Sequence, residues 1–113
     1  MSVQDCIFCK IISKYIPAKI IDENDDILVI QDLHPKAPVH YLIIPKKHIE
    51  NIKKLEEADS DYVAKMMLMA RKISEKLPGS GSFRLIMNNG KDAGQSVFHL
   101  HSHFLSGKKM TDF

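Results

Sequence analysis

Three histidines stand at every second position of the segment 98–105, at His99, His101 and His103. Side chains alternate between the two faces of a β-strand, whereas on a helix positions two apart diverge around the axis. A strand would therefore place the three imidazoles on one face, about 6 to 7 Å apart, with the bulky apolar residues between them on the other. We expect a strand over residues 98–105 that presents a row of imidazoles.

This imidazole row has three possible explanations. The histidines could be structural, although three in register are unusual for that role alone. They could bind a metal, because neutral imidazole is a common metal ligand. One of them could be a nucleophile that its neighbours tune.

A polar loop directly before the row favours chemistry on a phosphoryl group. Gly94, Gln95 and Ser96 offer accessible backbone N–H groups, a side-chain amide and a hydroxyl, and glycine-rich turns of this kind form anion-binding nests. Asn88, at the end of an expected strand, could place a further amide beside them. Each residue alone is an ordinary turn former. The combination of neutral donors and imidazoles predicts a phosphate site.

The elements that must position these residues follow a β-β-β-α-β-β order. We expect a short helix capped by Asp5, a hairpin within 20–30, a strand over 40–44, a helical turn at 48–52, a long helix from Asp59 to Leu77, and strands over 83–88 and 98–105. On the long helix, Met66, Met67 and Ala70 belong to the expected buried face. This order predicts an α+β fold: a five-stranded antiparallel sheet with one long and one short helix.

Composition bounds the class of protein. The 113 residues are 44% hydrophobic and 27% charged, with a net charge of +2. So small a charge gives no reason to expect a nucleic acid duplex or a membrane surface as partner. No apolar run approaches the ~20 residues of a membrane span, and the first residues lack the layout of a signal peptide. We expect a single domain, 1–113, that is cytoplasmic and not inserted in a membrane.

These motifs resemble the histidine triad (HIT) family, whose signature is three histidines separated by single apolar residues. The similarity covers nearly the whole chain, and the Hint branch is matched at 6–12, 16–18, 32–40, 44–48 and 94–98. Two positions depart from the pattern: Ser102 is polar where the signature is apolar, which predicts looser packing behind the strand, and Ala93 replaces a common loop glycine. The resemblance implies a HIT-like fold whose sheets pair into a ten-stranded sheet in a homodimer.

The resemblance implies a hydrolase or nucleotidyl transferase that cleaves nucleoside 5′-phosphoramidates or related adenylates, with a purine nucleotide, through a covalent nucleotidyl-histidine intermediate. It implies His101 as the nucleophile, His103 and Ser96 as contacts of the phosphate or leaving group, and His40 as a partner behind the row. Two other functions stay open. One is a dinucleoside polyphosphate hydrolase like the Fhit branch, against which residues 94–96 argue. The other is a non-enzymatic nucleotide-binding or interaction protein.

The resemblance also implies a nucleotide pocket. Asn88 and Gln95 would help to hold the phosphate beside Ser96 and His103, and Asp32 would bind the ribose hydroxyls. The apolar walls of the base pocket would be Ile7, Phe8, Ile11, Ile30 and Leu33. These five could equally be ordinary core residues.

Cys6 and Cys9 are the only cysteines, which argues against a disulfide framework. Such a Cys-x-x-Cys can be a redox pair, half of a metal site or two small buried residues, and redox use is least expected without a thioredoxin-like context. A tetrahedral zinc site needs two more ligands. His48 and His99 are the candidates, as in some bacterial relatives that this sequence resembles. Such a zinc would be structural and would hold His99, and no catalytic metal is expected.

Overall fold

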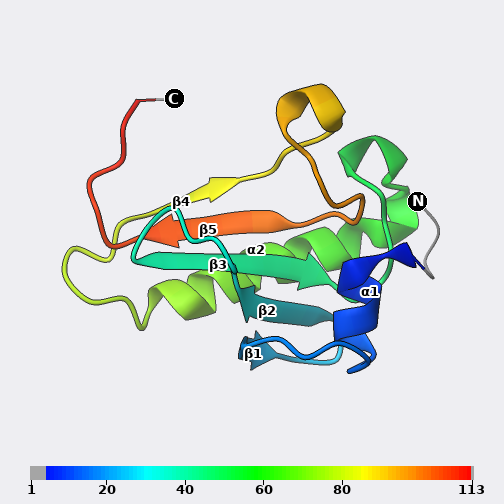
Figure 1. Cartoon of the computed structure of the whole chain (residues 1–113), viewed down its shortest axis with the longest axis horizontal. Helices are drawn as coiled ribbons and strands as arrows, with labels where there is room; N and C mark the ends of the chain where they lie inside the picture. Colours follow the sequence, from blue (N-terminus) through cyan, green and yellow to red (C-terminus); the bar gives the residue numbers. More distant parts are fainter. Residues whose placement is uncertain (1–4, 113) are drawn as a thin grey trace.

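A five-stranded antiparallel sheet is the frame of the protein, in a computed structural model that describes residues 5–112. The strands lie in the order β1-β2-β3-β5-β4 (Figure 1). Their bounds are β1 Ile20–Glu23, β2 Ile27–Gln31, β3 Val39–Pro45, β4 Phe83–Ile86 and β5 Ser102–Ser106. The predicted α+β fold is confirmed, with every neighbouring pair of strands antiparallel.

Two helices pack on opposite faces of this sheet (Figure 1). Their bounds are α1 Ile7–Ile12 and α2 Ser60–Ser74. Successive residues of β2 point to opposite faces, so Val29 packs in one apolar cluster with Met66 of α2, whereas Ile30 packs in a second cluster with Phe8 of α1. The sheet is thus buried on both sides where α1 and α2 cover it.

The long helix differs in detail from the prediction. Met69, rather than Met67, joins Met66 on its buried face, and Met67 is 42% exposed, because the buried stripe follows spacings of three and four residues. The helix ends at Ser74, short of Leu77, where tighter backbone bonds take over before the next proline. The helical turn expected at 48–52 forms instead as a 3₁₀ turn at Ile52–Lys54. Among the described residues, no helix is long and apolar enough to cross a membrane.

The predicted histidine strand begins later than expected. β5 starts at Ser102, so His103 lies in the strand, whereas His99 and His101 precede it. The ladder between β3 and β5 stops at the pair Ile43 and Ser102. Pro45, which ends β3, has no N–H with which to continue such a ladder. The prediction of one continuous strand over 98–105 was wrong, and the backbone before Ser102 makes other contacts.

Ser102 is fully buried on the α2 side of β5. It lies two residues from Phe104, which belongs to the apolar cluster under α2. Its Oγ has no hydrogen-bond partner among the described residues. A buried hydroxyl without a partner loses its hydration and gains nothing in return. Ser102 therefore lowers the stability of the face of β5 that meets α2.

We predict that Ser102→Ala raises the free energy of unfolding by about 1 kcal/mol, because it removes an unpaired polar group without leaving a large cavity. Urea denaturation measures this change. Ser106→Ala is the matched control, since the Ser106 Oγ donates to the Ser82 carbonyl at 2.6 Å and its loss should cost about 1 kcal/mol. A destabilised Ser102→Ala variant would contradict the account of this position.

Candidate active site and metal cluster

Four side chains with metal-binding atoms meet where α1, the segment after β3 and the segment before β5 converge. Cys6 caps α1 and Cys9 lies in its first turns, and the sulfur of Cys9 is 3.3 Å from His48 Nδ1. His99 Nδ1 lies 3.3 Å from the Cys6 sulfur and 3.5 Å from the Cys9 sulfur. The four ligand atoms all lie within 4.8 Å of one another. This cluster could hold a metal ion.

The protonation of His99 suits such a role. Its Nε2 lies 2.7 Å from the Pro45 carbonyl oxygen, which can only accept, so Nε2 carries the hydrogen. The Nδ1 lone pair is then free and faces the two sulfurs. Burial lowers the pKa of His99 to about 4, so the imidazole is neutral near pH 7. The backbone of β3 thereby sets the tautomer of a candidate ligand.

The carbonyl of His99 in turn orients His101. His101 Nδ1 lies 2.7 Å from that oxygen, so Nδ1 carries the hydrogen and Nε2 holds the free lone pair. The Phe8 ring packs edge-on against the His101 ring, with centroids 5.0 Å apart. Burial lowers the pKa of His101 below its ordinary value. His101 is therefore a neutral imidazole with one nucleophilic nitrogen, held in one orientation.

His103 has the opposite tautomer. The backbone N–H of Lys36 donates to His40 Nδ1 at 3.0 Å, so the hydrogen of neutral His40 is on Nε2. That Nε2 lies 2.9 Å from His103 Nδ1 and donates to it, which leaves the His103 hydrogen on Nε2. Burial is the main cause that lowers the pKa of His103 to about 4, with His101 and His40 adding to it. The site thus pairs a lone pair on His101 with an N–H donor on His103.

A cavity of about 340 Å³ opens beside His103. Asp32, Asn88, His40 and His103 line it together, and Asp32 Oδ2 lies 3.4 Å from His40 Nε2. The loop 90–95 approaches the same place, because Gly94, at φ +98°, lies against the Asn88 side chain. Ser96, which follows this loop, is exposed. The structure therefore brings most of the predicted polar residues to one cavity and its rim.

Gln95 is placed differently from its prediction. Its side-chain oxygen accepts hydrogen bonds from Asn51 Nδ2 at 3.2 Å and from the Gly90 N–H at 2.8 Å. Its amide nitrogen donates to the Glu50 and Val97 carbonyls at 2.8 Å and 3.1 Å. These four bonds use the full capacity of a glutamine amide. Gln95 has nothing left for a phosphate, and it holds the loop against the segment after β3.

The five predicted base-pocket residues fall into two groups. Phe8, Ile11 and Ile30 are buried in the cluster between α1 and the sheet, so they are core residues at this place. Ile7 and Leu33 are 42% and 87% exposed. Phe8 alone of the five has a ring contact with the histidines, with both His99 and His101. Of the five, only Ile7 and Leu33 are open to solvent, and the other three fill the core.

Backbone groups in this site escaped the sequence analysis. The Pro45 carbonyl and the Lys36 N–H set two imidazole tautomers, but residue type says nothing about where a main-chain group points. Asn51, which caps a 3₁₀ turn and supports Gln95, gave no signal beyond an ordinary turn residue. Of these residues, only Pro45 gave a signal in the sequence, because a proline is expected to end a strand.

Known proteins share both the sequence and the fold. Residues 5–113 match the family model described as "Scavenger mRNA decapping enzyme C-term binding". An uncharacterised HIT-like protein from Synechocystis sp. is 42% identical over 105 residues, which cover 93% of this chain and 92% of that protein. The chain belongs to the histidine triad family.

Solved HIT structures superpose closely on this one. A HIT family hydrolase from Clostridium thermocellum is 42% identical with a TM-score of 0.93, and the match covers 99% of this chain and 98% of that one. A histidine triad nucleotide-binding protein from Candida albicans is 27% identical with a TM-score of 0.78, covering 96% and 85% of the two chains. The resemblance drawn from the HIT motifs is confirmed at the level of family and fold.

The half-buried His103 yields a prediction about pH. Its pKa is about 4 in the folded protein and about 6.5 in an unfolded chain. Between these values the unfolded state binds more protons, so this histidine makes the protein less stable as pH falls from about 6.5 to 4. Imidazole NMR signals measure the titration of His103 directly. A His103 midpoint near 6.5 would contradict the neutral pair of His40 and His103.

Proposed function

We propose that this HIT protein is a hydrolase that cleaves nucleoside 5′-phosphoramidates, or related adenylates, through a nucleotidyl group carried by His101. The observation that supports this most is the hydrogen bond from His101 Nδ1–H to the His99 carbonyl. It leaves Nε2 as an unprotonated nucleophile near pH 7. The relatives named as HIT hydrolase and histidine triad nucleotide-binding protein support the same substrate class.

The proposed reaction has two displacements at phosphorus. His101 Nε2 attacks, a P–Nε2 bond forms, and the bond from phosphorus to the amine breaks with its electron pair leaving on nitrogen, which takes a proton from solvent. Water then attacks the same phosphorus, the electron pair of the P–Nε2 bond returns to His101, and a proton passes to solvent. The His99 carbonyl holds the Nδ1–H throughout, and so supports the imidazolium in between.

Other residues would bind the substrate. His103 Nε2–H would donate to the phosphoryl group, together with Asn88 and Ser96. Asp32 would accept from the ribose hydroxyls, and Ile7 and Leu33 would cover the base. Gln95 would act through the loop that it holds, as a positioning residue.

Replacing His101 tests the nucleophile. We predict that His101→Ala lowers kcat on an adenosine 5′-phosphoramidate by about 1,000-fold or more, since no other unprotonated nitrogen occupies its place. Nucleotide binding, measured by calorimetry, should persist because Asp32 and Asn88 remain. The exposed Arg71→Gln serves as control. If the kcat of His101→Ala stays within about tenfold of wild type, His101 is not the nucleophile.

We further propose that the metal cluster holds a structural zinc. Two thiols and two imidazoles are a donor set that zinc prefers, and four protein ligands would close the site. Bound there, zinc would act as a crosslink between α1, His48 and His99, outside the chemical steps. Burial and the adjacent Cys6 thiol raise the pKa of Cys9 to about 11, so binding would release protons.

Removing the metal should weaken the fold more than the chemistry of the site. We predict that Cys9→Ser abolishes stoichiometric zinc in native mass spectra and lowers the free energy of unfolding by about 3 kcal/mol or more, because a crosslink between distant segments is lost. His34→Ala, outside the cluster, should keep one zinc. A wild-type protein that binds no zinc and has the same free energy of unfolding as Cys9→Ser would contradict the site.

The HIT resemblance also leads us to propose that the chain, as one domain, forms a homodimer with a ten-stranded sheet. β4 lies at an edge of the sheet, and its Phe83 and Ile86 are 41% and 37% exposed. An edge strand with exposed apolar side chains favours pairing with a second copy. We predict a sedimentation mass of twice the 12.9 kDa chain; a monomer would contradict this.

A further inference from the structure

We propose that Arg84 binds an anionic group on the leaving part of the substrate. The preferred substrates would then be phosphoramidates whose amine also bears a carboxylate or a phosphate. The inference rests on the proposed hydrolysis at His101 and adds the chemical class of the leaving group. It starts from the place of one arginine in the sheet.

Arg84 lies on the same face of the sheet as the histidines. In the registers of β4, β5 and β3, Arg84 pairs with Leu105, and Leu105 pairs with His40. Residues directly opposite each other share a face. In the next row, Ile86 pairs with His103, so Arg84 and His103 are diagonal neighbours, about 7 to 8 Å apart. An extended arginine side chain can bridge much of that distance.

Arg84 has no anionic partner among the described residues of its own chain. Its side chain is half-buried, and within residues 5–112 it makes no ion pair or side-chain hydrogen bond. Several lysines of the chain do have a carboxylate, such as Lys46 with Glu23 and Lys72 with Asp22. A guanidinium that has lost part of its hydration gains most from a carboxylate or phosphate, which it can bind with two parallel hydrogen bonds.

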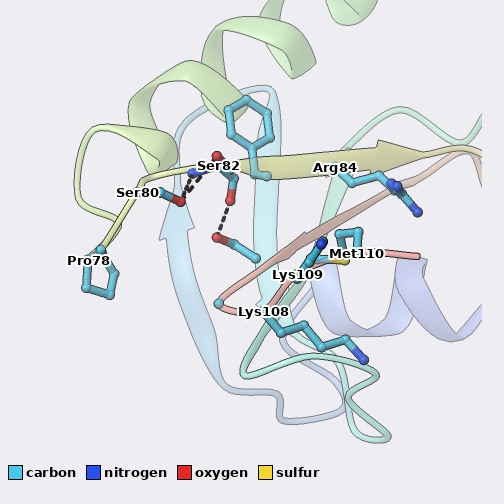
Figure 2. Close-up of a pocket in the computed structure, with 11 residues that line it drawn as sticks. Pro78, Ser80, Ser82, Arg84, Lys108, Lys109 and Met110 are labelled. Carbon is cyan, nitrogen blue, oxygen red and sulfur yellow. Dashed lines mark hydrogen bonds between the residues drawn. The ribbon is translucent and has the colours of Figure 1, made fainter. Parts of the chain in front are cut away.

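The surroundings of Arg84 are basic. A cavity of about 760 Å³ lies between the start of β4 and the segment after β5. Arg84, Lys108 and Lys109 line it together with serine hydroxyls, and no described residue contributes a carboxylate. Figure 2 shows these three cations around the cavity. Like charges gathered without a counter-charge raise the local concentration of anions. The cavity therefore suits the negative end of a ligand.

The proposed reaction would place the leaving group beside the smaller cavity, one row of the sheet from Arg84. In an in-line displacement the leaving group departs from the side of phosphorus opposite the nucleophile. His101 precedes β5, His103 lies in it, and their ring centroids are 5.1 Å apart. A leaving group that departs away from His101 and past His103 would lie over Ile86 and Leu105, which line the smaller cavity. Arg84 is the next residue of β4 on that face.

The test uses a matched pair of substrates: adenosine 5′-phosphoramidates of γ-aminobutyrate and of its primary amide, which differ only in charge. The measured quantity is the ratio of their kcat/KM values in one enzyme sample, because the fraction of folded enzyme cancels. We expect wild type to prefer the acid by about tenfold, Arg84→Gln to lose that preference, and Arg84→Lys to keep part of it. The exposed Arg71→Gln should match wild type.

The outcomes separate this inference from the proposed function. If wild type cleaves neither substrate, the hydrolysis itself is wrong. If it cleaves both at similar rates, or if Arg84→Gln leaves the ratio unchanged, only the role of Arg84 is overturned. A third substrate, with an aminopropyl phosphate as leaving group, distinguishes the two anions. The anion that the site prefers is the one whose substrate loses more kcat/KM on Arg84→Gln.

Discussion

The hydrogen bonds of His99 hold the rest of the site in place. Its Nε2–H is fixed on the carbonyl that ends β3, and its Nδ1 faces the two thiols of α1. The carbonyl of the same residue receives the hydrogen bond from His101. One fully buried residue therefore connects the N-terminal helix, the central strand and the nucleophile that we propose. Any shift of α1 relative to β3 would turn His101 as well.

The direction of their hydrogen bonds gives His101 and His103 different chemical roles. A carbonyl that can only accept gives His101 a free Nε2, and an amide that can only donate gives His103, through His40, a protonated Nε2. Burial keeps these imidazoles neutral by lowering their pKa values. Attack by a neutral nitrogen and donation by a neutral N–H both need that neutrality, so burial serves the function as well as the fold.

Much of this arrangement follows from residue type and spacing, and some of it does not. The alternation around His103 indicated the strand, and the pair Cys6 and Cys9 indicated the metal cluster. Both predictions rest on side-chain types, which can be read from the sequence. The start of β5 at Ser102 and the tautomers depend on main-chain groups of Pro45 and Lys36, which every residue type carries. Gln95 matched a phosphate contact by type alone, yet its amide is satisfied by partners distant in sequence.

The central claim is that His101 Nε2 carries the nucleotide during turnover. A rapid quench in base of the protein with an adenosine 5′-phosphoramidate, followed by peptide mass spectrometry, tests it most directly. The account predicts a nucleotidyl adduct on His101, attached at Nε2 and formed and lost at the rate of turnover. An adduct on another residue, or turnover with no adduct at any time point, would contradict it.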